Sequence, residues 1–232
     1  MKIFEKTKYN GTRKYYLFGV KVFEYQKKYK LKGDLSDNKL TLPDTGKFNI
    51  QIFGKNNEVY INPKNKKSSL SLIIYGDNNK VIINSTEDIH LHGVIGDINT
   101  KTKNTIFSVD KKTSINGMFF VLMDNNSSIK IGENCMFSCD IEFWASDTHS
   151  IFDSNGNLLN QGKEIIVGNN VWIGKDSKIL KNTTIPDGCI VGMRSVVSKK
   201  FTTTNAILAG VPAKVVKENI SWSNKRPNEF LK

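Results

Sequence analysis

Residues 165–197 read IIVGNNVWIGKDSKILKNTTIPDGCIVGMRSVV. An aliphatic residue stands at every sixth position of this stretch: Val167, Ile173, Ile179, Ile185, Val191 and Val197. Four positions after each of the first five stands a small or β-branched residue: Val171, Ser177, Thr183, Cys189 and Ser195. A period of six matches neither the 3.6 of a helix nor the 2 of a plain strand. The pattern predicts a coiled solenoid with one short strand and one corner per hexad.

Three such hexads close one coil, so we expect a triangular β-prism with aliphatic residues inside and small residues at the corners. Regular hexads begin upstream at Ile131, Phe137 and Phe143, then pause for 24 residues before Val167. The interrupting sequence, WASDTHSIFDSNGNLLNQGKE, is polar, contains glycine and has no period. It predicts a loop that protrudes from the prism near residues 145–163.

The region from about residue 48 to 128 alternates short β-type runs with Asx-rich turns such as FGKNN and YGDNN. Asparagine tolerates the left-handed backbone that tight corners need. The spacing is irregular, because Gly54 and Gly76 lie 22 residues apart rather than 18. We therefore expect looser coils with bulges or side loops here.

These patterns divide the chain into three parts. Residues 1–45 read as a basic, aromatic N-terminal extension, residues 46–203 as the solenoid, and residues 204–232 as a C-terminal cap and tail containing Trp222. The open ends of a solenoid invite stacking, so both outer parts are natural caps.

The chain has a formal net charge of +12, and its first 32 residues hold ten lysines or arginines against two glutamates. This basic and aromatic segment is compatible with a solvated face, with an anionic membrane surface or with guidance of an acidic substrate. No nucleic-acid motif accompanies the charge, so we expect no nucleic-acid partner. Three cysteines argue against a secreted disulfide framework, and no apolar run approaches 18 residues. We expect a cytoplasmic protein, with a peripheral membrane contact of residues 1–32 left open.

Three histidines are the main candidates for proton transfer or metal binding. His90 and His92 lie two apart, so on a strand they share a face, and with His149 they form a zinc alternative. We expect partly exposed strand histidines and no metal. His149 stands at the root of the predicted loop, two residues after Asp147, which could orient its imidazole. A near-neutral histidine in such a place can take a proton from an alcohol or amine.

The stretch IIVGNNVWIG (165–174) together with AGVPAK (209–214) resembles the hexapeptide-repeat acyltransferases, the left-handed parallel β-helix family. SDTHSIFD (146–153) and ISW (220–222) are similar to the branch that holds polysaccharide and sialic acid O-acetyltransferases, beside maltose, galactoside and xenobiotic acetyltransferases. The match is good over about residues 129–222, general over 48–128 and weak over 1–45. Left-handed coiling is implied by this resemblance alone, since parallel crossovers are usually right-handed.

The resemblance also implies a mechanism. Acetyl-CoA would lie between adjacent prisms of a homotrimer, with His149 as general base and Trp172 as oxyanion donor through its main-chain or indole N–H. No cysteine or serine stands in an activated context, which favours direct transfer. The residues that the resemblance assigns to CoA are Gly192, Met193, Arg194, Ser195, Lys199, Lys200, Gly210, Pro212 and Lys214.

The first hypothesis is an acetyl-CoA-dependent O-acetyltransferase acting on a sugar of a bacterial capsule, lipopolysaccharide or sialic-acid-type glycan, with an acidic acceptor suited to the positive charge. An amino-sugar N-acetyltransferase or an antibiotic-modifying acetyltransferase keeps the chemistry and changes the acceptor. A structural or glycan-binding solenoid without catalysis is the alternative of another class.

Overall fold

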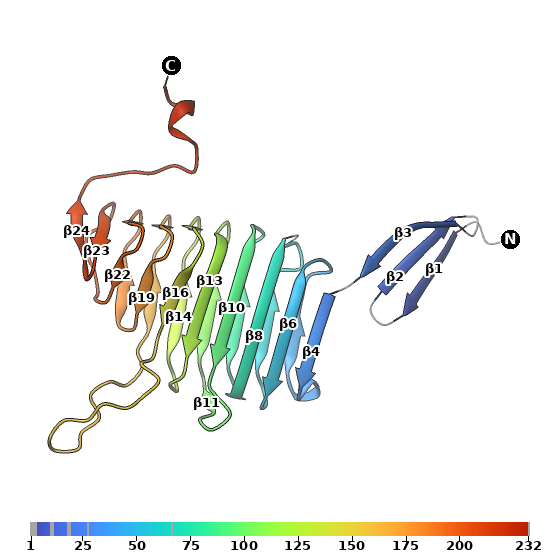
Figure 1. The fold of residues 1–232 in the computed structure, drawn as a ribbon, viewed down its shortest axis with the longest axis horizontal. Helices are drawn as coiled ribbons and strands as arrows, with labels where there is room; N and C mark the ends of the chain where they lie inside the picture. Colours follow the sequence, from blue (N-terminus) through green and yellow to red (C-terminus); the bar gives the residue numbers. More distant parts are fainter. Residues whose placement is uncertain (1–3, 10–11, 18–19, 27, 66, 232) are drawn as a thin grey trace.

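The computed structural model of the chain describes residues 4–9, 12–17, 20–26, 28–65 and 67–231. The described part consists of β-strands, connecting turns and two short 3-10 helices, Leu35–Asp37 and Pro227–Glu229. Most strands stack in parallel as successive rungs, and the coils wind in a left-handed sense (Figure 1). The predicted all-β, left-handed β-helix is therefore confirmed. Within the described residues, no helix is long and apolar enough to span a bilayer.

Two sheets form the solenoid. The front sheet has fourteen strands: β4 (Lys28–Gly33), β6 (Lys47–Phe53), β8 (Ser68–Asp77), β10 (Ile89–Ile95), β11 (Thr102–Lys103), β13 (Ser114–Leu122), β15 (Met136–Phe137), β16 (Ile141–Trp144), β18 (Trp172–Ile173), β19 (Lys178–Leu180), β21 (Ile190–Val191), β22 (Val196–Val197), β23 (Ile207–Gly210) and β24 (Ala213–Lys217). The rear wall has seven: β5 (Lys39–Thr41), β7 (Glu58–Ile61), β9 (Lys80–Ile83), β12 (Ile106–Val109), β14 (Ser128–Ile131), β17 (Ile165–Val167) and β20 (Thr183–Ile185).

The cross-section changes along the solenoid. In the first half one long strand crosses the whole front, as in the ten-residue β8. The nine-residue β13 then pairs with both β15 and β16, so one long strand gives way to two short ones around a new corner. The 22-residue spacing that suggested bulges thus reflects mostly regular two-walled coils. The irregularities seen there are one register shift between Ile89 and Leu91 and a loop at residues 96–101.

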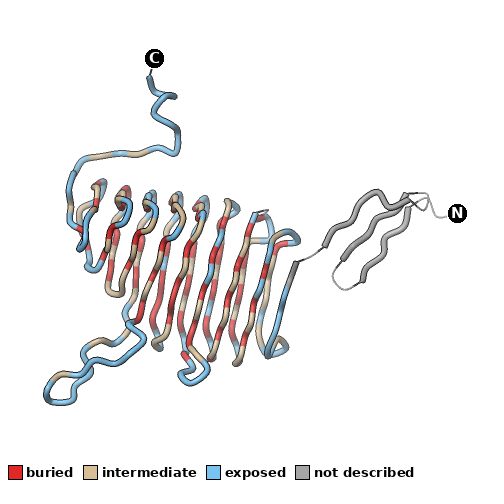
Figure 2. Tube along the Cα trace, in the orientation of Figure 1, coloured by how far each residue is buried: buried red, intermediate tan, exposed pale blue. Residues whose placement is uncertain are grey.

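The predicted hexads form the core of the second half. All six aliphatic residues of the repeat are buried, with at most 2% of their surface exposed. The small register is buried as well, and its hydroxyls satisfy corner carbonyls: Ser177 Oγ lies 2.9 Å from the oxygen of Gly174 and 3.0 Å from that of Gly192. Figure 2 shows buried positions recurring along the coils that follow the first. Each such aliphatic side chain stabilises the fold by about 1.5–3 kcal/mol.

The corners repeat with the same period. Residues with left-handed backbone recur every six positions at Asn134, Asp140, Asn170, Asp176, Asn182, Gly188 and Arg194. Three corners alternate: the first between β18 and β19 (residues 174–177) and between β21 and β22 (192–195), the second between front sheet and rear wall (181–182 and 198–199, with the loop), and the third between rear wall and β18 (168–171). Asn and Asp suit these positions because their short polar side chains lower the cost of the left-handed region.

The solenoid reaches beyond both of the predicted bounds, 46 and 203. At the N-terminal end β4 and β5 pair with β6 and β7, so the first coil begins at Lys28. At the other end, β23 stacks on β21 as another rung beyond residue 203, and β24 turns back along it in antiparallel fashion. β24 thereby occupies the open edge, which is the capping role expected of this segment.

Ahead of the first coil, β1 (Phe4–Tyr9), β2 (Thr12–Leu17) and β3 (Val20–Gln26) pair as a small antiparallel sheet. Side chains up to residue 29 are outside the described part, and the membrane contact considered for residues 1–32 depends on them.

Candidate active site

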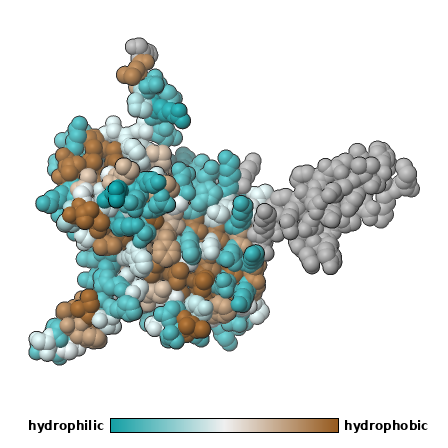
Figure 3. Space-filling view, in the orientation of Figure 1, coloured by the Kyte–Doolittle hydropathy of each residue, from teal (hydrophilic) through white to brown (hydrophobic). Residues whose placement is uncertain are grey.

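The predicted loop leaves the prism at the second corner, between Trp144 at the end of β16 and Ile165 at the start of β17 (Figure 1). The main-chain N–H of Lys163 donates to the oxygen of Ala145 at 3.2 Å and closes its base. An antiparallel bridge between Phe152 and Leu158 organises its outer part. Apolar side chains of this outer part are exposed, and Figure 3 shows apolar atoms on the projecting loop.

One side chain, Asn160, holds the loop root together. Its Nδ2 donates to Asp147 Oδ2 at 2.9 Å and to the main-chain oxygen of His149 at 2.7 Å. Its Oδ1 accepts from the N–H of Ile151 at 2.7 Å, and its main-chain oxygen accepts from Lys181 Nζ at 2.5 Å. Because these contacts lie on both sides of residue 149, they fix the backbone from which the imidazole projects. Asn160 gave no signal in the sequence, since it lies in a loop eleven residues away.

His149 is exposed at this root, and its described hydrogen bonds involve only its main chain. The expected orientation of the imidazole by Asp147 is not what the structure has. Asp147 Oδ2 instead lies 2.6 Å from Lys181 Nζ and accepts from Asn160. Burial tends to raise the pKa of this carboxyl, but hydrogen bonds from Lys181 and Asn160 outweigh burial and hold the pKa below its usual 3.8. Asp147 therefore anchors the root as a carboxylate.

Trp172 begins β18, directly after the third corner, and keeps 36% of its surface exposed. Its main-chain N–H donates to the oxygen of Cys189 on the next rung at 3.0 Å. Within the described residues, no hydrogen bond engages its indole N–H. Of the two donors that the resemblance left open for Trp172, only the indole is thus available to a ligand.

The C-terminal tail returns to this point. Trp222 Nε1 donates to the main-chain oxygen of Asn170 at 2.8 Å, and its ring lies 6.1 Å from that of Trp172 at an angle of 46°. The N–H of Ile220 donates to the oxygen of Asn205 at 2.9 Å. The sequence predicted a capping tail with a tryptophan, but the contact with Trp172 spans 50 residues and has no local signal.

His149 and Trp172 stand at different corners of the chain, and no contact joins their side chains within the described residues. The loop that carries His149 begins after Trp144, and Trp144 pairs with Leu180 on the next rung. Leu180 lies eight residues after Trp172 in the chain. At about 3.3 Å per residue, roughly 25 Å of chain, bent at the first corner, separates the two ends. One chain thus carries the two candidate groups at different corners.

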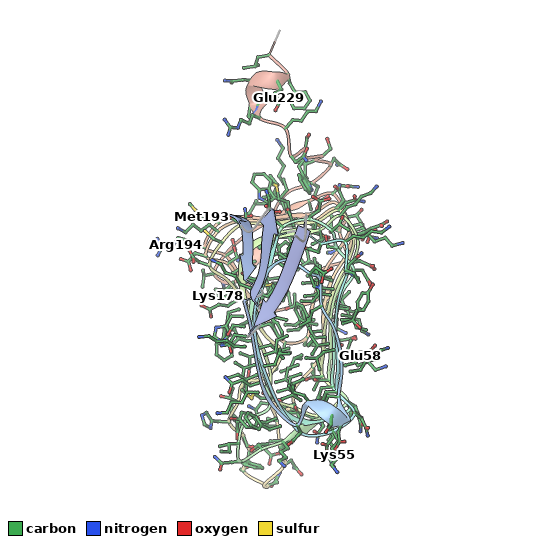
Figure 4. All side chains as sticks on the ribbon, turned by 90° about the vertical axis from the view of Figure 1, so that its right-hand side faces the viewer. Lys55, Glu58, Lys178, Met193, Arg194 and Glu229 are labelled. Carbon is green, nitrogen blue, oxygen red and sulfur yellow. The ribbon has the colours of Figure 1, made fainter. Side chains whose placement is uncertain are left out.

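Several of the candidate CoA residues gather at the first corner. The N–H of Gly210 donates to Ser195 Oγ at 3.2 Å, which joins the turn between β23 and β24 to residues 192–195. A Cβ on Gly192 would lie 3.1 Å from the Cβ of Ala209, so a larger residue would crowd these rungs. Met193 is 66% exposed, and Arg194 Nε lies 3.5 Å from Asp176 Oδ2. Figure 4 shows Met193, Arg194 and Lys178 on one side of the prism and Glu58 on the rear wall opposite.

The remaining candidates divide between two places. Pro212 and Lys214 belong to the β23–β24 hairpin beside Gly210, where Lys214 pairs with Ala209. Lys199 and Lys200 lie away from the first corner: Lys199 Nζ sits 5.0 Å above the ring of Phe201, and Lys200 bridges Thr184 on the rear wall. The structure thus brings together seven of the nine predicted CoA residues and separates these two lysines.

The cysteines and the other histidines complete the candidates. Burial raises the pKa of the Cys135 thiol to about 11, and burial also raises that of Cys189. Both thiols are protonated near neutral pH, which agrees with direct transfer. His90 and His92 lie exposed on β10, where His90 Nδ1 is 2.8 Å from Ser69 Oγ. Among the residues that the structure describes, no three His, Cys, Asp or Glu side chains are grouped to hold a metal ion.

Comparisons with known proteins identify the family of the chain. The family model "Bacterial transferase hexapeptide (six repeats)" matches residues 164–199, the uninterrupted hexads. A polysialic acid O-acetyltransferase of Neisseria meningitidis is 34% identical over 177 residues, which cover 76% of this chain and 80% of that protein. A polysialic acid O-acetyltransferase of Escherichia coli O1:K1 / APEC is 32% identical over 137 residues, or 59% of this chain and 44% of that protein.

Two solved structures extend the likeness to nearly the whole solenoid. The polySia-specific acetyltransferase NeuO superposes with a TM-score of 0.74 and 28% identity, over 87% of this chain and 92% of that one. The polysialic acid O-acetyltransferase OatWY gives a TM-score of 0.69 and 28% identity, over 85% and 92%. Sequence identity over most of both chains, the stacked hexads and the shared fold lead to one conclusion: this chain belongs to the hexapeptide-repeat acyltransferases and is an acetyltransferase.

Proposed function

We propose that the protein transfers an acetyl group from acetyl-CoA to a hydroxyl of a sialic-acid-type sugar in a bacterial surface glycan. The observation that carries the proposal is the likeness over three quarters of the chain to an enzyme named for O-acetylation of polysialic acid. A net charge of +12 suits an acceptor with carboxylates and a cosubstrate with phosphates.

In this proposal His149 is the general base. Its imidazole accepts the proton of the acceptor hydroxyl while the hydroxyl oxygen attacks the thioester carbonyl carbon. The tetrahedral intermediate then collapses, the C–S bond breaks, and the imidazolium returns the proton to the departing thiolate. General-base catalysis of this kind contributes about 10²–10⁴-fold in rate. The hydrogen bonds of Asn160 support this role because they fix the backbone on both sides of the histidine.

Trp172 supplies the oxyanion donor through its indole N–H. The main-chain N–H is committed to Cys189 at 3.0 Å, so it cannot turn toward a ligand without breaking the rung. Trp222 packs beside the ring and limits its rotation, which would reduce the reorganisation needed during reaction. The first corner, with Ser195 and Gly210, would hold the pantetheine and nucleotide parts of CoA.

A homotrimer brings these groups together. Since His149 and Trp172 lie at different corners of one chain, they can face one thioester only if two chains contribute. An outward row of the front sheet offers a surface for a second copy: neighbouring rungs place the partly exposed Ile73, Val94, Trp144 and Leu180 in one row. Val121 stands in the same row but is covered, with 2% of its surface exposed. Figure 3 shows apolar patches on this face. Val94→Asp should convert a trimer measured by light scattering into monomers.

The test is release of CoA thiol with sialic acid polymer as acceptor. His149→Ala should lower kcat by about 10²–10⁴-fold. His90→Ala, a matched exposed histidine on β10, should leave kcat unchanged. Trp172→Phe keeps an aromatic ring and removes the indole donor, and it should cost about 10²–10³-fold.

The competing functions give different results in the same assay. Release of CoA with amino sugars or antibiotics but not with the glycan would show that the acceptor is one of those molecules and not a sialic-acid-type glycan. Activity unaffected by His149→Ala would remove the proposed base. Glycan binding without any CoA release would indicate a non-catalytic solenoid.

A further inference from the structure

A groove of about 400 Å³ runs along the rear wall beside the root of the loop. Its lining includes three lysines, Lys130, Lys163 and Lys200, with Glu164 as the one carboxylate. Asparagine and serine residues from three rungs make up most of the rest. Polar hydrogen-bonding groups and surplus positive charge in one groove are suited to a hydrated, anionic ligand.

The charge in this groove is largely uncompensated. Lys130 Nζ lies 3.9 Å from Glu164 Oε2, a weak contact between partly exposed groups. Within the described residues, no ion pair engages Lys163 or Lys200. A groove of about 500 Å³ on the front sheet differs, because Asp140, Glu142 and Asp176 line it with Lys178. An anion is therefore favoured at the rear wall over the front.

The groove adjoins the segment that carries the candidate base. Lys163 is the loop residue whose N–H closes the root against Ala145 at 3.2 Å. Asn182, also in the lining, donates its N–H to the oxygen of Glu164 at 3.0 Å. Its neighbour Lys181 contacts Asp147 and Asn160. A ligand in the groove thus lies along the second corner, where His149 projects.

The length of the groove also suits a repeating ligand. Lys130 pairs with Ile166, Ile166 with Thr184, and Thr184 with Lys200, so the two lysines stand three rungs apart on one ladder. At about 4.8 Å per rung this is roughly 14 Å. A groove of that length can hold more than one sugar of a polymer, so Lys163 and Lys200, the two lysines without an ion pair among the described residues, can meet carboxylates on different sugars.

Resting on the proposed function, we propose that this groove binds the acceptor glycan, with Lys163 and Lys200 contacting its carboxylates. In this proposal Lys200 contacts the acceptor glycan and not CoA, to which the sequence resemblance assigned it. The residues assigned to CoA cluster at the first corner, which faces the opposite side of the prism from the rear wall (Figure 4). One chain thereby presents CoA and acceptor surfaces on different sides.

The experiment pairs Lys163→Gln/Lys200→Gln with a control double variant, Lys47→Gln/Lys64→Gln, which removes the same charge from exposed lysines of the early coils. Binding of a fluorescent sialic acid oligomer to the full protein is measured by anisotropy, and KM is measured separately for glycan and acetyl-CoA. The groove variant should raise the Kd and KM for glycan about tenfold, with KM for acetyl-CoA unchanged. The control should change neither more than about twofold.

A second arm uses the oligomer with its carboxyls reduced to alcohols. Wild type should bind this oligomer about tenfold more weakly, and the groove variant should lose nothing further. Equal effects of both double variants, or a higher KM for acetyl-CoA with an unchanged KM for glycan, would overturn the inference. If wild type released no CoA with any sialic acid glycan, the proposed function would fail, while the binding arm would still decide whether the groove holds the anion.

Discussion

Replacing Asn160 by alanine removes three side-chain hydrogen bonds at the loop root: to Asp147 at 2.9 Å, to the oxygen of His149 at 2.7 Å, and from the N–H of Ile151 at 2.7 Å. At partly exposed sites each contributes about 0.5 kcal/mol, so the root loses about 1.5 kcal/mol. That corresponds to roughly tenfold more frequent local opening. Global stability should hardly change, because the loop lies outside the buried hexads.

Hydrogen exchange and kinetics together test this reasoning. Amides of residues 147–151 should exchange about tenfold faster in Asn160→Ala. If His149 is the base, as proposed, kcat should fall about tenfold or more, because a displaced base loses near-attack geometry. Asn157→Ala is the matched control. Within the part of the chain that the structure describes, its side chain bonds Asp153 alone, at 2.9 Å and near the loop tip, so kcat should be unchanged. Faster exchange with wild-type kcat would show that turnover does not need a fixed root. Unchanged exchange would show that Asn160 does not hold it.

Three further predictions concern the core, the thiols and acid. Ile179→Ala, at a fully buried hexad position, should lower the free energy of unfolding by about 2–5 kcal/mol in urea titration, and a loss below 1 kcal/mol would contradict the close-packed prism. Cys135, with a pKa of about 11, should resist thiol reagents in the folded protein at pH 8 and react in urea; fast labelling of the folded form would contradict this. The Asp147 carboxyl has a lowered folded pKa, so its stabilising contact with Lys181 is fully present above about pH 3.8 and is lost as pH falls through the lower folded value. The protection factors of the root amides, that is, their exchange rates relative to the intrinsic rate at each pH, should therefore hold down to pH 4 and fall below it. A fall in protection already at pH 6 would contradict this.

The second half of the fold was predictable because its pattern is local. Within each six residues one aliphatic side chain points inward, such as Ile173, and one residue adopts the left-handed backbone of the corner, such as Asn170. The early coils were harder to read. A run such as SSLSLIIYGD shows its alternation plainly, but whether it forms one wall or two depends on pairing with strands 20 or more residues away. The start at Lys28 was missed because the charge of KYKLKG hid its alternation.

The candidate site was predictable only in part for the same reason. His149 and Trp172 stand in recognisable local motifs, and the turn at Gly192 repeats a hexad corner. Asn160 acts through contacts across a loop, and Trp222 acts through a tail that returns over 50 residues. The role expected of Asp147 failed because sequence proximity to His149 said nothing of Lys181, which the solenoid brings to the same corner from the following coil.

The change from two walls to three divides the solenoid into an early two-walled part and a later three-walled part, and the length of the first can change without the second. Each rung contacts mainly its neighbours, so the number of early coils sets the length of the two-walled part without altering the three-walled end that carries His149 and Trp172. Gain or loss of one whole early coil would shift the N-terminal sheet by about one strand spacing, roughly 4.8 Å, and leave the distances within the three-walled end unchanged. The length of the two-walled part and the geometry of the three-walled end are therefore set by different coils and can change independently.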